Sequence, residues 1–125
     1  MIKKFLSLKD IDCYFLSYNL SNYVWNIVIQ WNYFEKNSLG SQFARAIDSI
    51  SSNIAEGFGR YNKKDKVKFY RYSMGSLYEC LDWNQKSMKR DLITKEDYNF
   101  IFENLQKIKP EIYSLINYTN LKLKF

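Results

Sequence analysis

The sequence has no histidine, one proline, four glycines and two cysteines among its 125 residues, and each scarcity excludes a class of protein. Without histidine the chain lacks the commonest metal ligand and the usual base of enzymes that work near neutral pH. Cys13 and Cys80 are too few for a disulfide framework and lack the C-x-x-C spacing. Scarce glycine and proline argue against a collagen-like repeat, a disordered tail or a turn-rich β-sandwich. We therefore expect long helices, no metal or other cofactor, and no enzymatic activity.

Long uninterrupted apolar runs are also missing. The first residues are basic, but Asp10 interrupts them before a signal-peptide core has formed, so we predict that the protein is not secreted. No charged residue occurs from Cys13 to Phe34, yet seven Ser, Asn and Gln side chains in this stretch would make a membrane span costly. We expect a cytoplasmic protein with reduced thiols and no membrane partner.

Apolar residues recur at steps of three and four, the spacing of helices that pack in a bundle. The clearest series run from Val67 to Met88 and from Tyr98 to Leu115, and Asn62 and Thr94 precede them at positions suited to N-caps. The prediction is a single all-α domain over residues 1–125, an antiparallel up-down-up-down four-helix bundle with helices at about 10–36, 41–57, 63–90 and 95–120.

Two local features are expected to shape these helices. Pro110 lacks the backbone donor that a helix interior needs, at a cost of about 3 kcal/mol, so we expect a kink or a break near residues 107–109. Gly57 and Gly59 stand where the second helix ends, and glycine there suits a left-handed cap.

The first and third helices carry apolar side chains on more than one face, which favours self-association in a symmetric ring or dimer.

Positive charge is concentrated in one segment of the chain. The formal charge is +6, and residues 60–72 hold six basic side chains against Asp65 alone, which makes +5. Lysines near a helix N-terminus oppose the helix dipole, so folding alone does not favour them there. Aromatic residues alternate with these cations, a pattern that suits phosphate neutralisation together with stacking on unpaired bases. A solvated helix start whose aromatic rings point into the bundle explains the same pattern, and both interpretations stay open.

The polar residues of the second and third helices favour structure over catalysis. Their carboxylates lack the histidines that di-iron bundles pair with them, so no metal site is predicted. Asn53 and Glu56 lie where helix backbones are expected to come close, and polar groups in such a place need partners. Ser76, Glu79 or an amide of a neighbouring subunit are the expected partners.

Several short motifs occur together in the sequence: Leu39-Gly-Ser-Gln42, Arg45-Ala46, Ser49-Ile50, Asn-Ile-Ala-Glu-Gly-Phe-Gly-Arg at residues 53–60, and Gly75-Ser-Leu-Tyr-Glu79. Their combination resembles the four-helix-bundle family of the 23S rRNA intervening-sequence proteins, which also contains the accessory variability proteins of diversity-generating retroelements. The resemblance spans about residues 5–120 and departs from the family at Ser51, where proline is usual. It implies an antiparallel four-helix protomer, a ring that is commonly a homopentamer, and no catalysis.

The predicted function is a non-enzymatic, homo-oligomeric RNA-binding accessory protein that holds phosphates through a basic patch without strong sequence preference. The alternative is a protein-interaction scaffold for a partner such as a reverse transcriptase or a ribosome-associated factor. The charge cluster predicts nucleic-acid binding by Arg60, Lys63, Lys64, Lys66, Lys68 and Arg71. The resemblance implies the same role for Arg45 and also matches Arg60. The resemblance assigns packing or assembly to Asn53, Glu56, Gly57, Gly75, Ser76 and Glu79.

Overall fold

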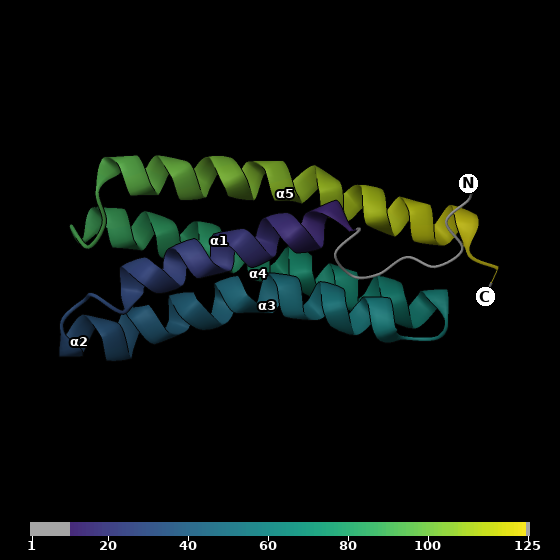
Figure 1. The fold of residues 1–125 in the computed structure, drawn as a ribbon, viewed down its shortest axis with the longest axis horizontal. Helices are drawn as coiled ribbons and strands as arrows, with labels where there is room; N and C mark the ends of the chain where they lie inside the picture. Colours follow the sequence, from purple (N-terminus) through teal and green to yellow (C-terminus); the bar gives the residue numbers. More distant parts are fainter. Residues whose placement is uncertain (1–10, 125) are drawn as a thin grey trace.

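The computed structural model describes residues 11–124, and all regular structure in this part of the chain is helical (Figure 1). The elements are α1 (Asp12–Val28), α2 (Tyr33–Glu35), the π-helical turn η2 (Lys36–Gly40), α3 (Ser41–Gly59), α4 (Lys63–Lys89) and α5 (Lys95–Lys122). Because α2, η2 and α3 follow one another without a gap, they form one continuous helix. The prediction of an all-α chain with four long helices is confirmed for these residues, and the predicted helix start at residue 10 lies outside them.

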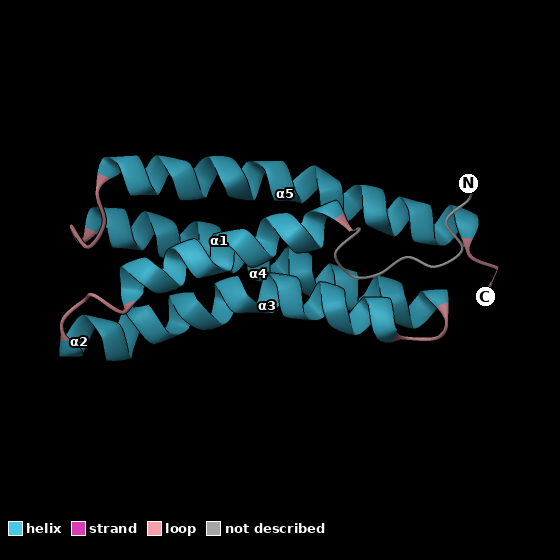
Figure 2. Ribbon diagram, in the orientation of Figure 1, coloured by secondary structure: helices cyan, strands magenta, loops and turns pink. Residues whose placement is uncertain are grey.

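The long helices lie side by side and are joined by short loops (Figure 2). Figure 1 shows the chain running along the length of the fold in α1, returning in α3, and reversing direction again in α4 and in α5. α3 packs against α1 and α4, and α5 packs against the same two helices. α1 and α4 therefore occupy diagonally opposite corners, and within residues 11–124 each has one long face that no other helix covers.

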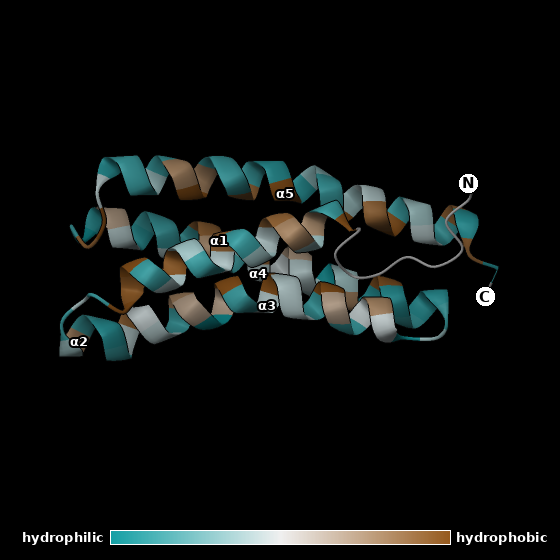
Figure 3. Cartoon of the chain, viewed as in Figure 1, coloured by the Kyte–Doolittle hydropathy of each residue, from teal (hydrophilic) through white to brown (hydrophobic). Residues whose placement is uncertain are grey.

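The core follows the apolar spacing of the sequence. Hydrophobic and hydrophilic residues alternate along each helix (Figure 3). Full burial of one large apolar side chain contributes roughly 1.5–3 kcal/mol, so the buried apolar side chains dominate the stability of the helices. The central layers are made by Phe43, Ile47, Ile50 and Ile54 of α3, Tyr70 and Leu77 of α4, and Ile101, Leu105, Ile108 and Ile112 of α5. Within residues 11–124, no helix combines the length and the hydrophobicity that a membrane crossing needs.

Side-chain caps begin α4 and α5, as the sequence predicts. The Asn62 side-chain oxygen accepts a hydrogen bond from the Asp65 N–H at 2.8 Å. The Thr94 hydroxyl accepts one from the Asp97 N–H at 3.0 Å. Each cap satisfies a backbone donor that the helix cannot pair internally and contributes about 1 kcal/mol.

The first turn between helices lies earlier in the chain than predicted. α1 ends at Val28 and the next helix begins at Tyr33, whereas the prediction extended the first helix to residue 36 and began the second at 41. The Asn32 side chain caps this earlier start by accepting the Glu35 N–H at 3.3 Å. Gly40 does not end a helix, because it is buried inside the π turn, where an added Cβ would lie 2.9 Å from Val28 Cγ1. Its missing side chain lets this helix pass close to α1.

The sequence predicts a kink or a break in the last helix near Pro110, and the helix does not break there. α5 runs without interruption from Lys95 to Lys122, and Figure 1 shows its axis changing direction near the middle of the helix. Pro110 and Gln106 are both exposed, so water can reach the carbonyl group that the proline leaves without a donor. Solvent access therefore makes the proline tolerable at this position.

Gly57 has a different role from the predicted left-handed cap, because no glycine among the described residues has a positive φ. Gly57 is buried, and an added Cβ would lie 2.6 Å from Tyr70 Cε1 and 3.0 Å from the Lys66 carbonyl oxygen. The glycine thus allows α3 to contact the Tyr70 ring of α4 directly. α3 ends at Gly59, and Arg60 after it is extended.

Candidate nucleic-acid interface

One exposed face of α4 carries three of the predicted cations. Lys64, Lys68 and Arg71 follow one another at steps of four and three, which places them on the same side of the helix. We call Lys64, Lys68 and Arg71 the α4 basic row. Arg60 lies just before α4, on the connection from α3, and is also exposed.

Aromatic side chains lie beside the basic row. The Arg60 guanidinium carbon is 4.6 Å from the centre of the Phe69 ring, and Lys68 Nζ is 5.3 Å from the same centre. Phe69 and Tyr72 meet edge to face with their centres 5.4 Å apart. Phe69 therefore holds two cations in place. Tyr61 and Tyr72 are 83% and 52% exposed, so their rings are accessible to a ligand.

Lys63 contacts the protein's own backbone. Its Nζ donates to the Asn120 carbonyl at 3.3 Å and to the Leu123 carbonyl at 3.4 Å, at the C-terminal end of α5. A cation in this position pairs with free carbonyl groups and interacts favourably with the helix dipole. Lys63 therefore fastens the end of α5 to the start of α4.

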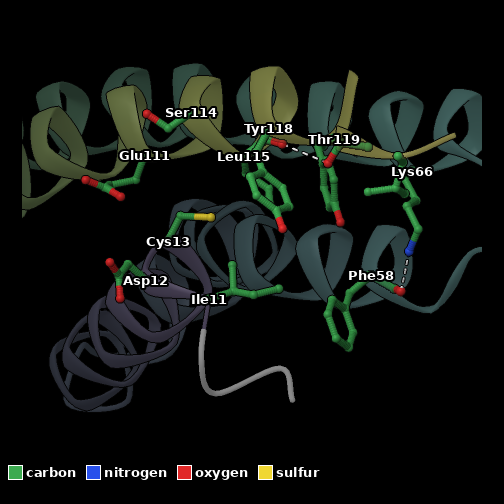
Figure 4. A pocket seen from close by; sticks show the side chains of 12 residues that line it. Ile11, Asp12, Cys13, Phe58, Lys66, Glu111, Ser114, Leu115, Tyr118 and Thr119 are labelled. Carbon is green, nitrogen blue, oxygen red and sulfur yellow. Dashed lines mark hydrogen bonds between the residues drawn. The ribbon is translucent and has the colours of Figure 1, made fainter. Parts of the chain in front are cut away.

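Lys66 has a similar role at the end of α3, beside an open pocket of about 370 Å³ (Figure 4). Its Nζ donates to the Phe58 carbonyl at 2.7 Å and to the Gly57 carbonyl at 3.4 Å. Burial lowers the pKa of Lys66 because it disfavours the charged ammonium. Apolar side chains such as Leu115 line much of the pocket, and the Glu111 carboxylate there repels anions. The Lys66 ammonium therefore caps α3 and is poorly placed for a phosphate.

Arg45 lies apart from the other predicted cations. It is exposed on the outer face of α3, about 22 Å before Arg60 along the helix axis, since each helical residue adds about 1.5 Å. A single phosphate cannot contact both arginines. Only an extended strand that follows α3 would reach Arg45 and the basic row together.

The exposed face of α4 changes the sign of its charge beyond Gly75. Glu79 and Asp82 are exposed on the continuation of the line that contains Arg71. Asp82 pairs with Lys86 one turn later, with 2.6 Å between the charged atoms. The continuous positive charge of this face is therefore confined to the N-terminal half of α4 and the preceding connection, and Lys86 and Lys89 follow only beyond the two carboxylates. Sequence reasoning grouped Glu79 with a motif and missed its position in line with the basic row, although helical spacing alone places it there.

Asn53 and Glu56 have partners on α3 and at its end, rather than the expected partners on α4. The Asn53 amide donates to the Ser49 carbonyl at 2.9 Å, one turn earlier in the same helix. Glu56 forms an exposed ion pair with Arg60, with 2.8 Å between the charged atoms. Ser76, one of the expected partners, is buried in α4.

The outer face of α1 carries a second surface feature. Its exposed large side chains share one side of the helix, and no charged residue separates them. We call this set the α1 apolar stripe, made of Phe15, Tyr18, Trp25 and Ile29. The expected surplus of apolar surface on the first helix is therefore present. The uncharged side chain of Asn22 is also exposed, between Tyr18 and Trp25, and apolar side chains that gather on one face in this way are typical of an interaction site.

Among residues 11–124, the thiols and carboxylates do not form a reactive cluster. Cys13 and Cys80 are free and buried; burial raises the pKa of Cys13 to about 12 and raises that of Cys80 as well. A buried, protonated thiol is a poor nucleophile and a poor ligand. In the part of the chain that the structure describes, no three His, Cys, Asp or Glu residues gather in the way a metal ion requires.

Comparison with known proteins gives a family match and a structural match. A family model described as 23S rRNA-intervening sequence protein matches residues 9–114. The fold is similar to the crystal structure of a protein of unknown function from the S23 ribosomal protein family of Bacteroides thetaiotaomicron. That comparison has a TM-score of 0.79 and 21% sequence identity, and it covers 87% of this chain and 98% of the other. No curated protein sequence gives a significant match.

Proposed function

Because the chain belongs to the family of 23S rRNA-intervening sequence proteins, we propose that it is a non-enzymatic accessory protein that binds RNA through the α4 basic row. The supporting observation is the exposure of Lys64, Lys68 and Arg71 on one face of α4, with Arg60 and the Tyr72 ring beside them. The positive charge that the sequence concentrates in this segment is thus presented to solvent by four side chains. Lys63, Lys66 and Arg45 are not part of the central contact.

The proposed binding mechanism is electrostatic. Each cation that neutralises a phosphate releases a counterion, which drives association without recognition of base edges. The exposed Tyr61 and Tyr72 rings stack only on unpaired bases, and such stacking contributes roughly 1–3 kcal/mol per base. The protein is therefore expected to favour single-stranded RNA and to show little sequence preference.

Assembly of several copies is part of the proposal. The resemblance noted in the sequence implies an antiparallel up-down-up-down protomer and a ring that is commonly a homopentamer. The α1 apolar stripe supports self-association because it exposes large side chains without charges between them. A ring would repeat the basic row, and repetition raises the avidity for any RNA long enough to reach several rows.

Titration of a labelled single-stranded RNA at a series of salt concentrations tests the RNA function. With three or four phosphates contacted, the slope of log K against log salt concentration is expected to be about −2 to −3. The variant K64Q/K68Q/R71Q should lose most of the affinity and most of this slope. The variant K89Q/K95Q/K107Q removes three exposed cations elsewhere and is the matched control. Absence of binding at low salt, or equal losses in the two variants, would contradict the proposal.

A second candidate function is a protein-interaction scaffold. The α1 apolar stripe favours it, because an uncharged surface of exposed rings suits a protein partner better than a polyanion. The expected partner is a reverse transcriptase or a ribosome-associated factor. Gentle co-purification distinguishes the two functions: RNA retained with the protein supports the first, and a bound protein without RNA supports the second. A reverse transcriptase gene beside this gene would favour the scaffold.

A further inference from the structure

Gly75 lies near the middle of α4 on its exposed face. Apart from the adjoining turns of its own helix, no atom of residues 11–124 lies within 4 Å of the position that a Cβ would occupy there. A glycine inside a helix is less favourable than alanine by roughly 0.5–1 kcal/mol. Gly40 and Gly57 each leave room for a neighbouring side chain that a Cβ would displace. At Gly75 no neighbouring group from the described part of the chain occupies the corresponding space. The close approach of a backbone from outside the chain would explain a glycine in this position.

The charges on the two sides of Gly75 are opposite in sign. Arg71 lies four residues before the glycine and Glu79 four residues after it, and both are exposed. Lys68 and Asp82 repeat the opposition seven residues away on each side. Among residues 11–124, neither Arg71 nor Glu79 forms an ion pair or a side-chain hydrogen bond. This face of α4 is therefore complementary in charge to a copy of itself that runs in the opposite direction.

Helix-packing geometry allows the two faces to meet. Arg71, Gly75 and Glu79 form one row with a spacing of four, and rows of this kind interdigitate when helices cross at about −50°, the commonest class of packing. With a two-fold axis at Gly75, a residue before the glycine in one copy is level with the corresponding residue after it in the other. Tyr72 and Tyr78 stand three residues before and after the crossing, 52% and 48% exposed, and supply apolar area on both sides.

We propose that two copies of this chain dock in antiparallel orientation through the outer face of α4, centred on Gly75 and held by two ion pairs between Arg71 of one copy and Glu79 of the other. Arg71 also belongs to the α4 basic row, so docking and RNA compete for it; only this competition rests on the proposed function. A ring leaves this face of α4 available where both of its contact surfaces lie on other parts of the protomer. In that case two rings pair instead of two single chains.

Charge reversal tests the docking, because the two-fold axis places residue 71 of each copy opposite residue 79 of the other. Arg71→Glu alone, or Glu79→Arg alone, places like charges opposite each other at both ends of the contact. Each single variant should halve the mass of the assembly in sedimentation experiments and raise the dissociation constant at least about tenfold. The double variant R71E/E79R recreates both ion pairs and should restore the mass. An equal mixture of the two single variants should also restore it, because each copy supplies the charge that the other lacks.

A substitution that changes no charge provides an independent test. Gly75→Leu fills the crossing point and should also halve the mass, while its effect on the helix itself is favourable. Lys89→Glu reverses a charge near the end of α4, away from the crossing, and should leave the mass unchanged. Circular dichroism confirms that each variant is folded.

The outcomes separate this inference from the RNA function. A wild-type mass that stays constant in R71E and G75L, or a double variant that fails to reassemble, overturns the docking and leaves RNA binding to its own titration. A mass that responds as expected in a protein that binds no RNA supports the docking and overturns only the proposed function.

Discussion

Gly57 of α3 and Tyr70 of α4 are in direct contact, and a Cβ on the glycine would stand 2.6 Å from Tyr70 Cε1. The Tyr70 side chain is one of the largest in the buried core and is 2% exposed, so it has little freedom to move aside. Lys66 places its carbonyl oxygen on another side of the same site, 3.0 Å from that Cβ position. This close contact between α3 and α4 thus requires a residue without a side chain.

Gly57→Ala should therefore destabilise the protein by about 1–3 kcal/mol, the usual effect of overpacking a well-filled core. Gly75→Ala is the matched control, because it makes the same change on an open face of α4. It should leave stability unchanged or raise it by up to about 1 kcal/mol. Urea unfolding at protein concentrations too low for association measures both. Equal effects of the two substitutions would contradict the close contact at Gly57.

Tyr70 also predicts how stability depends on alkaline pH. Burial raises the pKa of Tyr70 from 10.0 to about 12, and the structure describes no hydrogen bond to its hydroxyl group. Above pH 10 the unfolded chain loses this proton while the folded chain keeps it. Stability from this group is therefore complete below pH 10 and falls between about pH 10 and 12, at up to about 1.4 kcal/mol per pH unit.

Tyr70→Phe should remove that contribution and flatten the decline, while keeping the ring against Gly57 and most of the stability at pH 7. Burial also raises the pKa of Cys13 from 9.0 to about 12. The Cys13 thiol therefore causes a similar decline in stability that begins near pH 9, and this decline remains in the variant. Urea unfolding of both proteins from pH 8 to 11 gives the two slopes. Identical slopes would mean that Tyr70 ionises equally easily in the folded and unfolded chains.

Lys63 and Lys64 are neighbours in sequence with different expected roles. Lys63 donates to carbonyl groups at the end of α5, whereas Lys64 is exposed and belongs to the α4 basic row. Lys63→Gln should lower stability by about 0.5–1.5 kcal/mol and change the salt dependence of RNA binding little. Lys64→Gln should preserve stability and reduce the salt slope by about 0.7, the value for one contact to a single strand. Unfolding and RNA titration of both variants check this division, and a reversal of the two patterns would refute it.

Local signals in the sequence predict the starts of α4 and α5, because Asn62 and Thr94 act within one turn of themselves. Asn32 with Glu35 three residues later is a similar signal, but the run of uncharged apolar and amide residues around it favoured one longer helix. Gly40 lies inside the following helix because of a tertiary contact with Val28 that no local pattern reveals. The same limit applies to the candidate interface: helical spacing places Lys64, Lys68 and Arg71 together, but only the fold shows that Lys63 and Lys66 reach the ends of other helices.

RNA and a second copy of the chain are expected to compete for Arg71. Addition of a short single-stranded RNA of about ten nucleotides, long enough to cover the α4 basic row, should halve the mass of the protein assembly. Glu79→Gln removes the carboxylate that holds Arg71 in the docked state. At protein concentrations where the wild type is docked, this variant should therefore bind RNA more tightly.

The gain in the Glu79→Gln variant must exceed the general effect of losing one negative charge. Glu103→Gln provides the control, because Glu103 is exposed on α5 and lies outside the docking face. At concentrations low enough to separate the wild-type copies, the advantage of Glu79→Gln over Glu103→Gln should shrink, since no docked state then competes for Arg71. A sedimenting complex that contains RNA and an intact docked pair would show instead that the two contacts use different parts of α4.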